Sequence, residues 1–508
     1  MTKKLCALAV LLFLAVTTAS AQDARTVLQN VNKAMGTETL KSIQYTGKGW
    51  IRAFGQTFSA EEDWPNLDMP AYTRTIDYDA KTSNEKLTRS QGTNPRRGGG
   101  GIPLAADQEQ TALVNGNYAW TIQGANAVAQ PAAAERRQLE IWLTPHGFLK
   151  AAGQARDLKA TTVTLATTTA GPGGDYTFLS FTQGKFRLNG QINSQNLVER
   201  VQTWLPDPVL GDMIFEVRYT GYKDFNGVQF PAVLHTHQGI GRGSLGHNFM
   251  EVQVADAKPN VPVAALAVPD AVRTAAVPPV VANSTRLATG VWLIGGGSHN
   301  SVLVEFRDFV TVVEAPQNEA RSLAVIAEVK KLVPNKPIKY VVNTHHHFDH
   351  SGGLRTFSVY GATIVTHQSN RAFYEDYLLD PAPRTIDADL LSGLNPWFAQ
   401  NRVPPIETVN DKYVLSDGVR TLDLYFVQGL NHAASMLVAY LPTEKILVNA
   451  DLYGPPAAGA PAPVVNANMT SLYNNITRLK LDVVQHVPIH GAPGTNADFL
   501  KYMGKTGN

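Results

Sequence analysis

Histidine and aspartate side chains gather in one short segment of the 508-residue chain. Nine of the thirteen histidines lie in the second half of the chain, and residues 345–350 read His-His-His-Phe-Asp-His. His345 and His347 share one side of an extended segment, as two ligands of one ion require, while Asp349 and His350 can turn toward a second ion. Imidazole nitrogen and carboxylate oxygen both suit zinc. The segment therefore predicts a metal site built without thiolates.

Further side chains complete this pattern or lie close to it in the sequence. Three expected ligands each follow an apolar, strand-like run, where a loop can present them at a sheet edge: His432, Asp451 and His490. His346 lies between two ligands, so we expect it to point away and to pack or form hydrogen bonds. His299 and His367 can line the site or be structural. Tyr453 can donate a hydrogen bond to an oxyanion, with a core or loop tyrosine as the alternative.

The order and setting of these residues resemble the metallo-β-lactamase superfamily over residues 286–500. The resemblance implies an αββα sandwich with one or two metal ions at the edge of its two sheets. It makes His345, His347 and His432 ligands of the first ion, Asp349, His350 and His490 ligands of the second, and Asp451 the bridge between them. Two such ions, with zinc expected, share a hydroxide whose pKa falls from ~15.7 toward ~7. Asp349 would also orient this nucleophile.

The resemblance leaves the substrate open, because one fold serves many reactions. Dedicated β-lactamases of the superfamily use a cysteine at the second metal or lack the bridging aspartate, whereas this chain has Asp451 and a single cysteine, Cys6. The resemblance therefore favours a hydrolase that cleaves an ester-like bond of a small molecule, such as a lactone, thioester or phosphodiester. The alternatives are a β-lactamase, a metal-bound but inactive domain, and a periplasmic binding or carrier protein with a structural metal domain.

The first 21 residues predict a cleavable signal peptide. Lys3 and Lys4 precede an apolar run that ends before the cleavage pattern Ala19-Ser-Ala21. We therefore expect a periplasmic or secreted protein, and the mature chain loses Cys6, its only source of a disulfide or thiolate ligand. No segment has the roughly 18–20 uninterrupted apolar residues of a membrane span.

Charge argues against nucleic acid as a partner. The chain has 44 Lys and Arg against 42 Asp and Glu, and loss of Lys3 and Lys4 leaves the mature chain balanced. An exported protein without net charge lacks the electrostatic attraction on which nucleic-acid binding depends. The oligomeric state stays open.

Periodicity predicts an α+β protein of two domains. Residues 23–35 have helical spacing before Gly36, and residues 214–219 alternate as a strand with one wet face. Similar runs at 44–51, 161–165 and 228–234 predict a β-rich domain over residues 22–257. This domain is faintly similar to lipoprotein-carrier folds. The alternative is a scaffold or oligomerisation module. Within this domain, four consecutive glycines predict a flexible loop at residues 94–103. We expect His235 and His237 to lie on a solvated strand face.

An Ala, Val and Pro-rich stretch, residues 258–283, predicts a semi-extended linker to the hydrolase domain at residues 284–508. In that second domain, strands are expected at 290–294, 301–306, 309–313 and 339–343, with helices at 321–332 and around 472–479.

Overall fold

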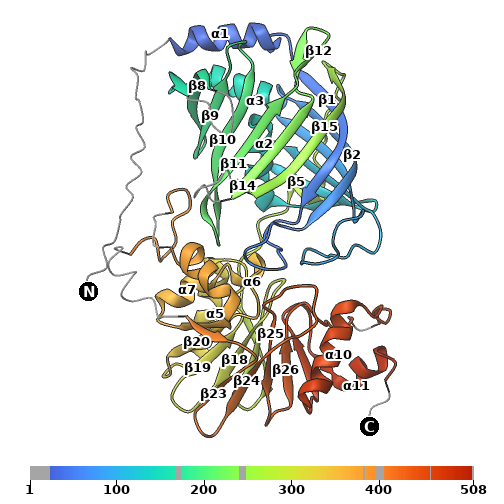
Figure 1. Cartoon of the computed structure of the whole chain (residues 1–508), viewed down its shortest axis with the longest axis vertical. Coiled ribbons are helices and arrows are strands. Elements are labelled where there is room, and N and C mark those ends of the chain that lie inside the picture. Colours follow the sequence, from blue (N-terminus) through green and yellow to red (C-terminus); the bar gives the residue numbers. More distant parts are fainter. Residues whose placement is uncertain are drawn as a thin grey trace, which may run out of the picture.

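The computed structural model describes residues 23–165, 173–239, 247–380, 384–394, 406–457 and 459–505. The predicted signal peptide, residues 1–21, lies outside these ranges. Among the described residues, no helix has the length and apolar character needed to cross a membrane. Figure 1 shows an N-terminal region above a C-terminal region; here they are residues 23–282 and 283–505.

The chain begins with the predicted helix, α1 (Ala24–Met35). Asp23 caps it, since its carboxylate accepts hydrogen bonds from the backbone N–H groups of Arg25 and Thr26. Gly36 ends it in the left-handed conformation, with φ of 68°. Val31 and Met35 are among the residues that bury the apolar face of this helix.

One antiparallel sheet of 13 strands, counted within the described residues, dominates the N-terminal region. Its spatial order is β6-β5-β4-β3-β2-β1-β15-β14-β11-β10-β9-β8-β7. The strands are β1 (Ser42–Arg52), β2 (Asn66–Asp77), β3 (Thr82–Ser90), β4 (Gln108–Asn115), β5 (Tyr118–Gln123), β6 (Asn126–Ala129), β7 (Lys159–Leu165), β8 (Gly174–Gln183), β9 (Phe186–Ile192), β10 (Val198–Asp207), β11 (Gly211–Thr220), β14 (Val233–Gly239) and β15 (His247–Pro259).

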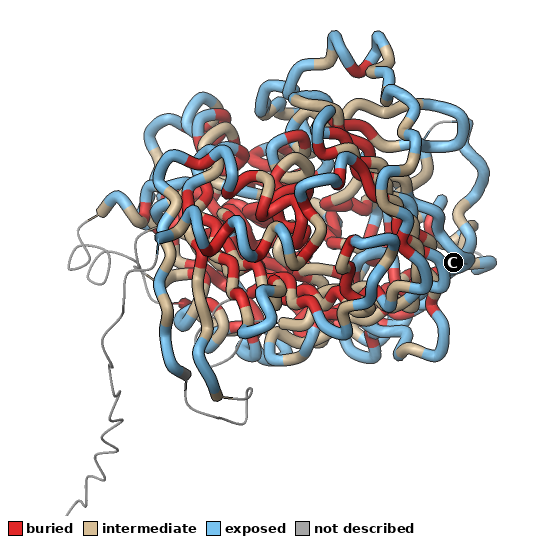
Figure 2. Tube along the Cα trace, turned by 90° about the horizontal axis from the view of Figure 1, so that it is seen from above, coloured by how far each residue is buried: buried red, intermediate tan, exposed pale blue. Residues whose placement is uncertain are grey.

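Two helices that the sequence pattern did not reveal fill the curve of this sheet: α2 (Ala134–Trp142) and α3 (Pro145–Gln154). They contact β3, β4 and β5 on one flank and β8 and β10 on the other, so the sheet bends around them (Figure 1). Buried residues gather in the middle of the molecule and exposed ones on its outer loops (Figure 2). Buried Leu139, Phe148 and Leu149 join the strands in one core.

Two other expectations for this region need correction. The run 228–234 is not one strand, because Pro231 and Ala232 separate β13 (Val228–Phe230) from β14; β13 pairs instead with β12 (Lys223–Phe225) in a separate hairpin. The predicted linker also carries structure, since β15 runs through Pro259 and α4 (Asp270–Arg273) follows. Val272 packs with Trp120 of β5 in a small buried cluster, so part of this segment lies on the N-terminal sheet.

The C-terminal region contains two further sheets, and the expected α+β sandwich is confirmed. The first has the order β16 (Asn283–Ala288), β17 (Val291–Gly295), β18 (Ser301–Glu305), β19 (Val310–Val313), β20 (Ile338–Val342), β21 (Thr363–His367), β22 (Glu407–Val409). The second has the order β23 (Lys412–Ser416), β24 (Thr421–Phe426), β25 (Leu437–Leu441), β26 (Ile446–Asn449), β27 (Gln485–Pro488), β28 (Gly494–Thr495). Apolar residues of both sheets form one buried core, among them Val304 and Leu424.

Helices lie on the outer faces of these sheets (Figure 1). On the first sheet, α5 (Glu319–Leu332) and α7 (Leu354–Val359) pack Val325 and Phe357 against buried strand residues. On the second, α10 (Ala467–Leu479) and α11 (Asn496–Tyr502) supply Leu472 and Phe499. A one-turn helix, α6 (Phe348–Ser351), lies at the side that faces the N-terminal region.

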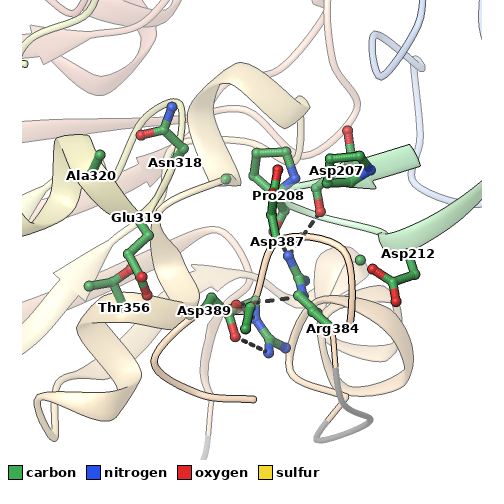
Figure 3. Close-up of a pocket in the computed structure, with 15 residues that line it drawn as sticks. Asp207, Pro208, Asp212, Asn318, Glu319, Ala320, Thr356, Arg384, Asp387 and Asp389 are labelled. Carbon is green, nitrogen blue, oxygen red and sulfur yellow. Dashed lines mark hydrogen bonds and ion pairs between the residues drawn. The ribbon is translucent and has the colours of Figure 1, made fainter. Parts of the chain in front are cut away.

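Arg384 is one point at which the two regions meet. Its guanidinium donates hydrogen bonds to the carbonyl oxygens of Asp207, Pro208 and Val209 in the turn between β10 and β11, at 2.9, 2.7 and 3.2 Å. Figure 3 shows Arg384 between Asp207 and Asp389, beside a cavity of about 440 Å³. None of the histidines in the predicted metal site lines this cavity.

Candidate metal centre

Every expected ligand lies in a loop or turn just after a strand of the C-terminal sandwich. His345 and His347 follow β20, and α6 then carries Asp349 and His350. The remaining three, His432, Asp451 and His490, follow β24, β26 and β27 of the second sheet. These strands end at the same edge of the sandwich, and the seven side chains converge there.

The first group of donor atoms belongs to His345, His347, His432 and Asp451. Nε2 of His345 lies 2.9 Å from Nδ1 of His347 and 3.2 Å from Oδ2 of Asp451. Nε2 of His432 lies 2.9 Å from the same Asp451 oxygen. Three imidazole nitrogens and a carboxylate oxygen thus face one another, which is the donor set of a tetrahedral zinc site.

The second group belongs to Asp349, His350, His490 and a residue with two possible roles in the sequence analysis, His299. Nε2 of His350 lies 3.2 Å from Nε2 of His490, and Oδ2 of Asp349 lies 3.8 Å from Nε2 of His350. Nε2 of His299 lies 3.3 Å from Oδ2 of Asp349. The structure therefore brings His299 to the second group, beside the three expected ligands.

Asp451 lies between the two groups. Its Oδ2 is 2.9 Å from His432 and 3.1 Å from Nε2 of His350, while its Oδ1 is 2.9 Å from Nε2 of His490. The residue has φ of 58°, in the left-handed region that non-glycine residues rarely occupy. Such strain is often found at functional sites. One carboxylate here contacts ligands of both groups, as a bridging residue must.

The second nitrogen of several rings has its own partner. Nδ1 of His345 lies 3.0 Å from Oγ1 of Thr344, and Nδ1 of His490 lies 3.2 Å from the carbonyl oxygen of Ser298. Nδ1 of His350 lies 2.5 Å from Oε2 of Glu314. Partners of this kind select the tautomer whose other nitrogen is free to bind a metal. The donor set therefore fits two divalent cations.

Glu314 is a residue of the candidate centre that sequence reasoning missed. It is fully buried, directly follows β19, and has φ of 73°. Its carboxylate also accepts hydrogen bonds from the backbone N–H and Oγ1 of Thr344, at 2.8 and 3.0 Å. The sequence did contain a signal for Glu314, a charged residue at the end of an apolar strand. Buried glutamates are rare without partners, so such a residue is expected to have one.

A histidine binds a metal as the neutral ring, and an aspartate binds it as the ionised carboxylate. Most of these side chains have that protonation state at neutral pH. Burial lowers the pKa of His345 to about 3 and that of His347 well below 6.5, so both rings are neutral. For Asp451, burial acts in the opposite direction, but the surrounding imidazoles hold its pKa well below the usual range. Burial likewise opposes ionisation of Asp349, and His299 and His350 outweigh it and lower the pKa.

His350 behaves differently because two carboxylates flank it. Burial lowers its pKa, but Asp451 and Glu314 outweigh burial and raise the pKa well above 6.5. A cation held at Nε2 would compete with that proton, so metal uptake at this group should release a proton.

Exposure differs between the two groups. The side chains of His345 and His347 are fully buried, whereas those of Asp349 and His490 are 38% and 39% exposed. The most exposed of the expected ligands therefore belong to the second group.

The other candidate residues have structural partners. His346 points away from the cluster, as expected: its nitrogens lie 2.8 Å from Oγ1 of Thr57 and 2.9 Å from Oγ of Ser435. His367 stacks on the ring of Phe426.

Tyr453 is 4% exposed and packs against His486 and Phe499. The structure thus places its ring in the core of the second sheet, which is the alternative to a role at the oxyanion. His237 is 7% exposed and lies 3.3 Å from Glu216, so the expected solvated face is wrong for this residue.

Part of the chain is similar to known proteins. The family model described as "Metallo-beta-lactamase superfamily" matches residues 294–482. A linear primary-alkylsulfatase from Pseudomonas sp. (strain ATCC 19151) is 24% identical over 226 residues, which are 38% of this chain and 41% of the relative. The matched part thus spans about two fifths of that relative's length.

Two metallo-β-lactamases are among the solved structures that match part of the chain. The enzyme from Pontibacter korlensis has 18% identity and a TM-score of 0.33, covering 44% of this chain and 96% of its own. FIM-1 from Pseudomonas aeruginosa, in a mono-zinc form, has 20% identity and a TM-score of 0.33, covering 44% and 94%.

Proposed function

Because residues 294–482 belong to the metallo-β-lactamase superfamily, whose members include metal-dependent hydrolases, we propose that the protein is an exported hydrolase of an ester-like bond. Its catalytic part would be residues 284–508, reached through the linker at 258–283 from a β-rich domain at 22–257. Its cofactor would be two divalent cations, with zinc expected from the His and Asp donors. The predicted superfamily and enzyme class agree with the family match.

The single observation that carries this proposal is the position of Asp451. Its Oδ2 contacts His345 and His432 of the first group and also His350 of the second, and its Oδ1 contacts His490 of the second group. An anionic bridge holds two cations together and tunes the nucleophile between them. The superfamily's dedicated β-lactamases generally lack such a bridge, which favours an ester-like substrate.

The substrate class follows from the same centre. A carboxylic, phosphoric or sulfuric ester each presents an oxygen that a cation can polarise and a leaving oxygen or sulfur that it can stabilise. The alkylsulfatase relative adds sulfate esters to the lactones, thioesters and phosphodiesters expected from the sequence.

The chain's own residues have distinct roles in this reaction. His345, His347 and His432 would hold the first cation, and Asp349, His350 and His490 the second. When bound, the cations would lower the pKa of a coordinated water toward ~7 and polarise the substrate. Asp349 is ionised at neutral pH and 38% exposed, so its carboxylate can accept a hydrogen bond from the attacking water and orient it. The carboxylate of Glu314 contacts Nδ1 of His350 and so fixes the orientation of the His350 ring.

A substrate panel tests this proposal. Purified protein saturated with zinc is assayed against a lactone, a thioester, a phosphodiester, an alkyl sulfate and a β-lactam. We expect kcat/KM to be highest for one of the ester classes and to fall in Asp451→Ser, which removes the bridge and leaves three ligands for each cation. A β-lactam value well above all the others would favour the β-lactamase alternative. Stoichiometric metal without any hydrolysis would favour a binding or carrier protein.

A further inference from the structure

A loop of the N-terminal region reaches the metal centre. It connects β1 to β2, residues 53–65, and its backbone is tied to both histidine-bearing loops. The backbone N–H of Phe348 donates to the carbonyl oxygen of Gly55 at 3.2 Å, and that of Ala434 donates to the carbonyl oxygen of Phe58 at 2.7 Å. Phe348 follows His347, and Ala434 lies two residues after His432, so the loop is anchored beside two expected ligands.

Between these anchors, the carbonyl oxygen of Thr57 lies 2.9 Å from Nε2 of His347. A carbonyl only accepts, so His347 must carry its proton on Nε2. This leaves the lone pair on Nδ1, the atom that faces His345 across 2.9 Å. The N-terminal region therefore selects the tautomer of an expected ligand of the first cation.

Gln56 contacts an expected ligand of the second cation. Its Nε2 donates a hydrogen bond to Oδ1 of Asp349 at 2.8 Å, and its Oε1 accepts one from the backbone N–H of Gly100 at 2.8 Å. The Gly100 contact determines which end of the amide faces Asp349. Oδ2 of Asp349 then stays on the side of His299 and His350.

The glycine-rich segment, expected to be a flexible loop, lies against the same two side chains. A Cβ on Gly99 would lie 2.1 Å from Oε1 of Gln56 and 2.5 Å from Cε1 of His347. The backbone N–H of Gly98 donates to the carbonyl oxygen of Asn431 at 2.8 Å, next to His432. Only a residue without a side chain can approach the buried His347 ring this closely.

We infer that the N-terminal region completes the metal centre, with Gln56 as a positioning residue for Asp349 and with Thr57 and Gly99 holding His347 in its ligand orientation. This inference rests on the proposed metal centre. It gives the N-terminal region a specific role, because the region contacts one expected ligand of each cation, His347 and Asp349. Gln56 acts through Asp349 and needs no contact with the substrate.

Metal binding tests the inference directly. Metal-free protein is titrated with Zn²⁺ against a competing chelator, and with Co²⁺ while its d–d absorption is recorded. Gln56→Leu removes the hydrogen bond to Asp349, and we expect the affinity for one of two ions to fall by about 10–100-fold, with a changed Co²⁺ spectrum. Gln56→Glu keeps the length but places a second carboxylate against Asp349, so it should not restore the wild-type spectrum.

Gly99→Ala addresses the other ligand. It should shift His347 and weaken binding of the other ion, in a protein whose circular dichroism is unchanged. Gln123→Leu, on an exposed strand position, and Gly153→Ala, where no atom lies within 4 Å of the added Cβ, are the matched controls and should bind two ions as wild type does.

The outcomes separate this inference from the proposed function. Wild-type affinities and Co²⁺ spectra in both Gln56 variants would overturn the positioning role of Gln56 while leaving the metal centre intact. If Gly99→Ala fails to fold, the two Gln56 variants still test whether the N-terminal region positions an expected ligand. Wild-type protein that takes up neither Zn²⁺ nor Co²⁺ would overturn the proposed function itself.

Discussion

Oε2 of Glu314 lies 2.5 Å from Nδ1 of His350, and both side chains are fully buried. The two residues come from different loops, one after β19 and one in α6. Because the carboxylate occupies Nδ1, Nε2 of His350 faces Asp451 and His490. Glu314 thus orients the ring of an expected ligand.

Glu314→Gln should therefore weaken metal binding. The glutamine amide would turn an N–H group toward either Thr344 or His350, both of which donate to the carboxylate, so one contact becomes repulsive. We expect the affinity for one ion to fall by about 10–100-fold in a zinc titration. Glu375→Gln is the control, because Glu375 is exposed and pairs with Arg371 on the surface. Equal affinities in both variants would argue against this role.

The paired variant His345→Ala with His347→Ala should remove one metal ion. Wild-type protein should contain about two ions per chain by elemental analysis and the variant about one, because two of three histidine ligands of one group are lost. Hydrolysis should fall by at least about 100-fold. Full metal content together with full activity would show that the ligand assignment is wrong.

Arg384→Ala should loosen the contact between the two regions. The guanidinium is mostly buried and donates to three carbonyl oxygens of the turn after β10, and hydrogen bonds to a charged group contribute about 1.5–3 kcal/mol each. Urea unfolding should show a loss of at least about 1.5–3 kcal/mol, the contribution of one such hydrogen bond, and limited proteolysis near residues 260–282 should be faster. Arg307→Ala, at an exposed arginine, should behave as wild type. Unchanged proteolysis in Arg384→Ala would contradict this account.

Stability should decrease in acid because of Glu216. Burial opposes its ionisation, but His237, Arg200 and Arg218 outweigh burial and lower its pKa from 4.5 to about 2. A carboxyl group with a depressed folded-state pKa stabilises the protein above pH ~4.5 and loses this contribution as pH falls toward 2. The contribution is about 3 kcal/mol at neutral pH.

The corresponding measurement is urea unfolding of wild type and Glu216→Gln from pH 7 to pH 3. Wild type should lose more stability than the variant over the lower part of this range. Glu109→Gln, at an exposed strand position, serves as the control and should follow wild type. Parallel curves for wild type and Glu216→Gln would exclude this source of acid sensitivity.

Export should remove the first 21 residues. Lys3, Lys4 and the Ala19-Ser-Ala21 pattern predict that mass spectrometry of the exported protein finds Gln22 at its N-terminus. Exported material that retains Met1 would be inconsistent with a cleavable signal peptide.

Sequence alone predicted the donor residues of the candidate centre and their order along the chain. Each expected ligand directly follows a strand-like run, and the alternation of apolar residues that marks a strand is a local pattern. For the same reason α1, α5 and α10 could be predicted from helical spacing. The positions of His345, Asp451 and His490 in the chain were therefore enough to imply a shared sheet edge.

Tertiary structure decided which other groups reach that edge. Thr57 and His347 are 290 residues apart, and no periodicity links a loop of one sheet to a ligand in another. In the sequence, Glu314 is only the charged end of a strand, and folding buries it against His350. The helix α3 was missed because most of its residues are buried, and such burial weakens the amphipathic pattern that reveals a surface helix. Local spacing records which residues share a face, whereas these contacts join two regions that lie far apart in the sequence.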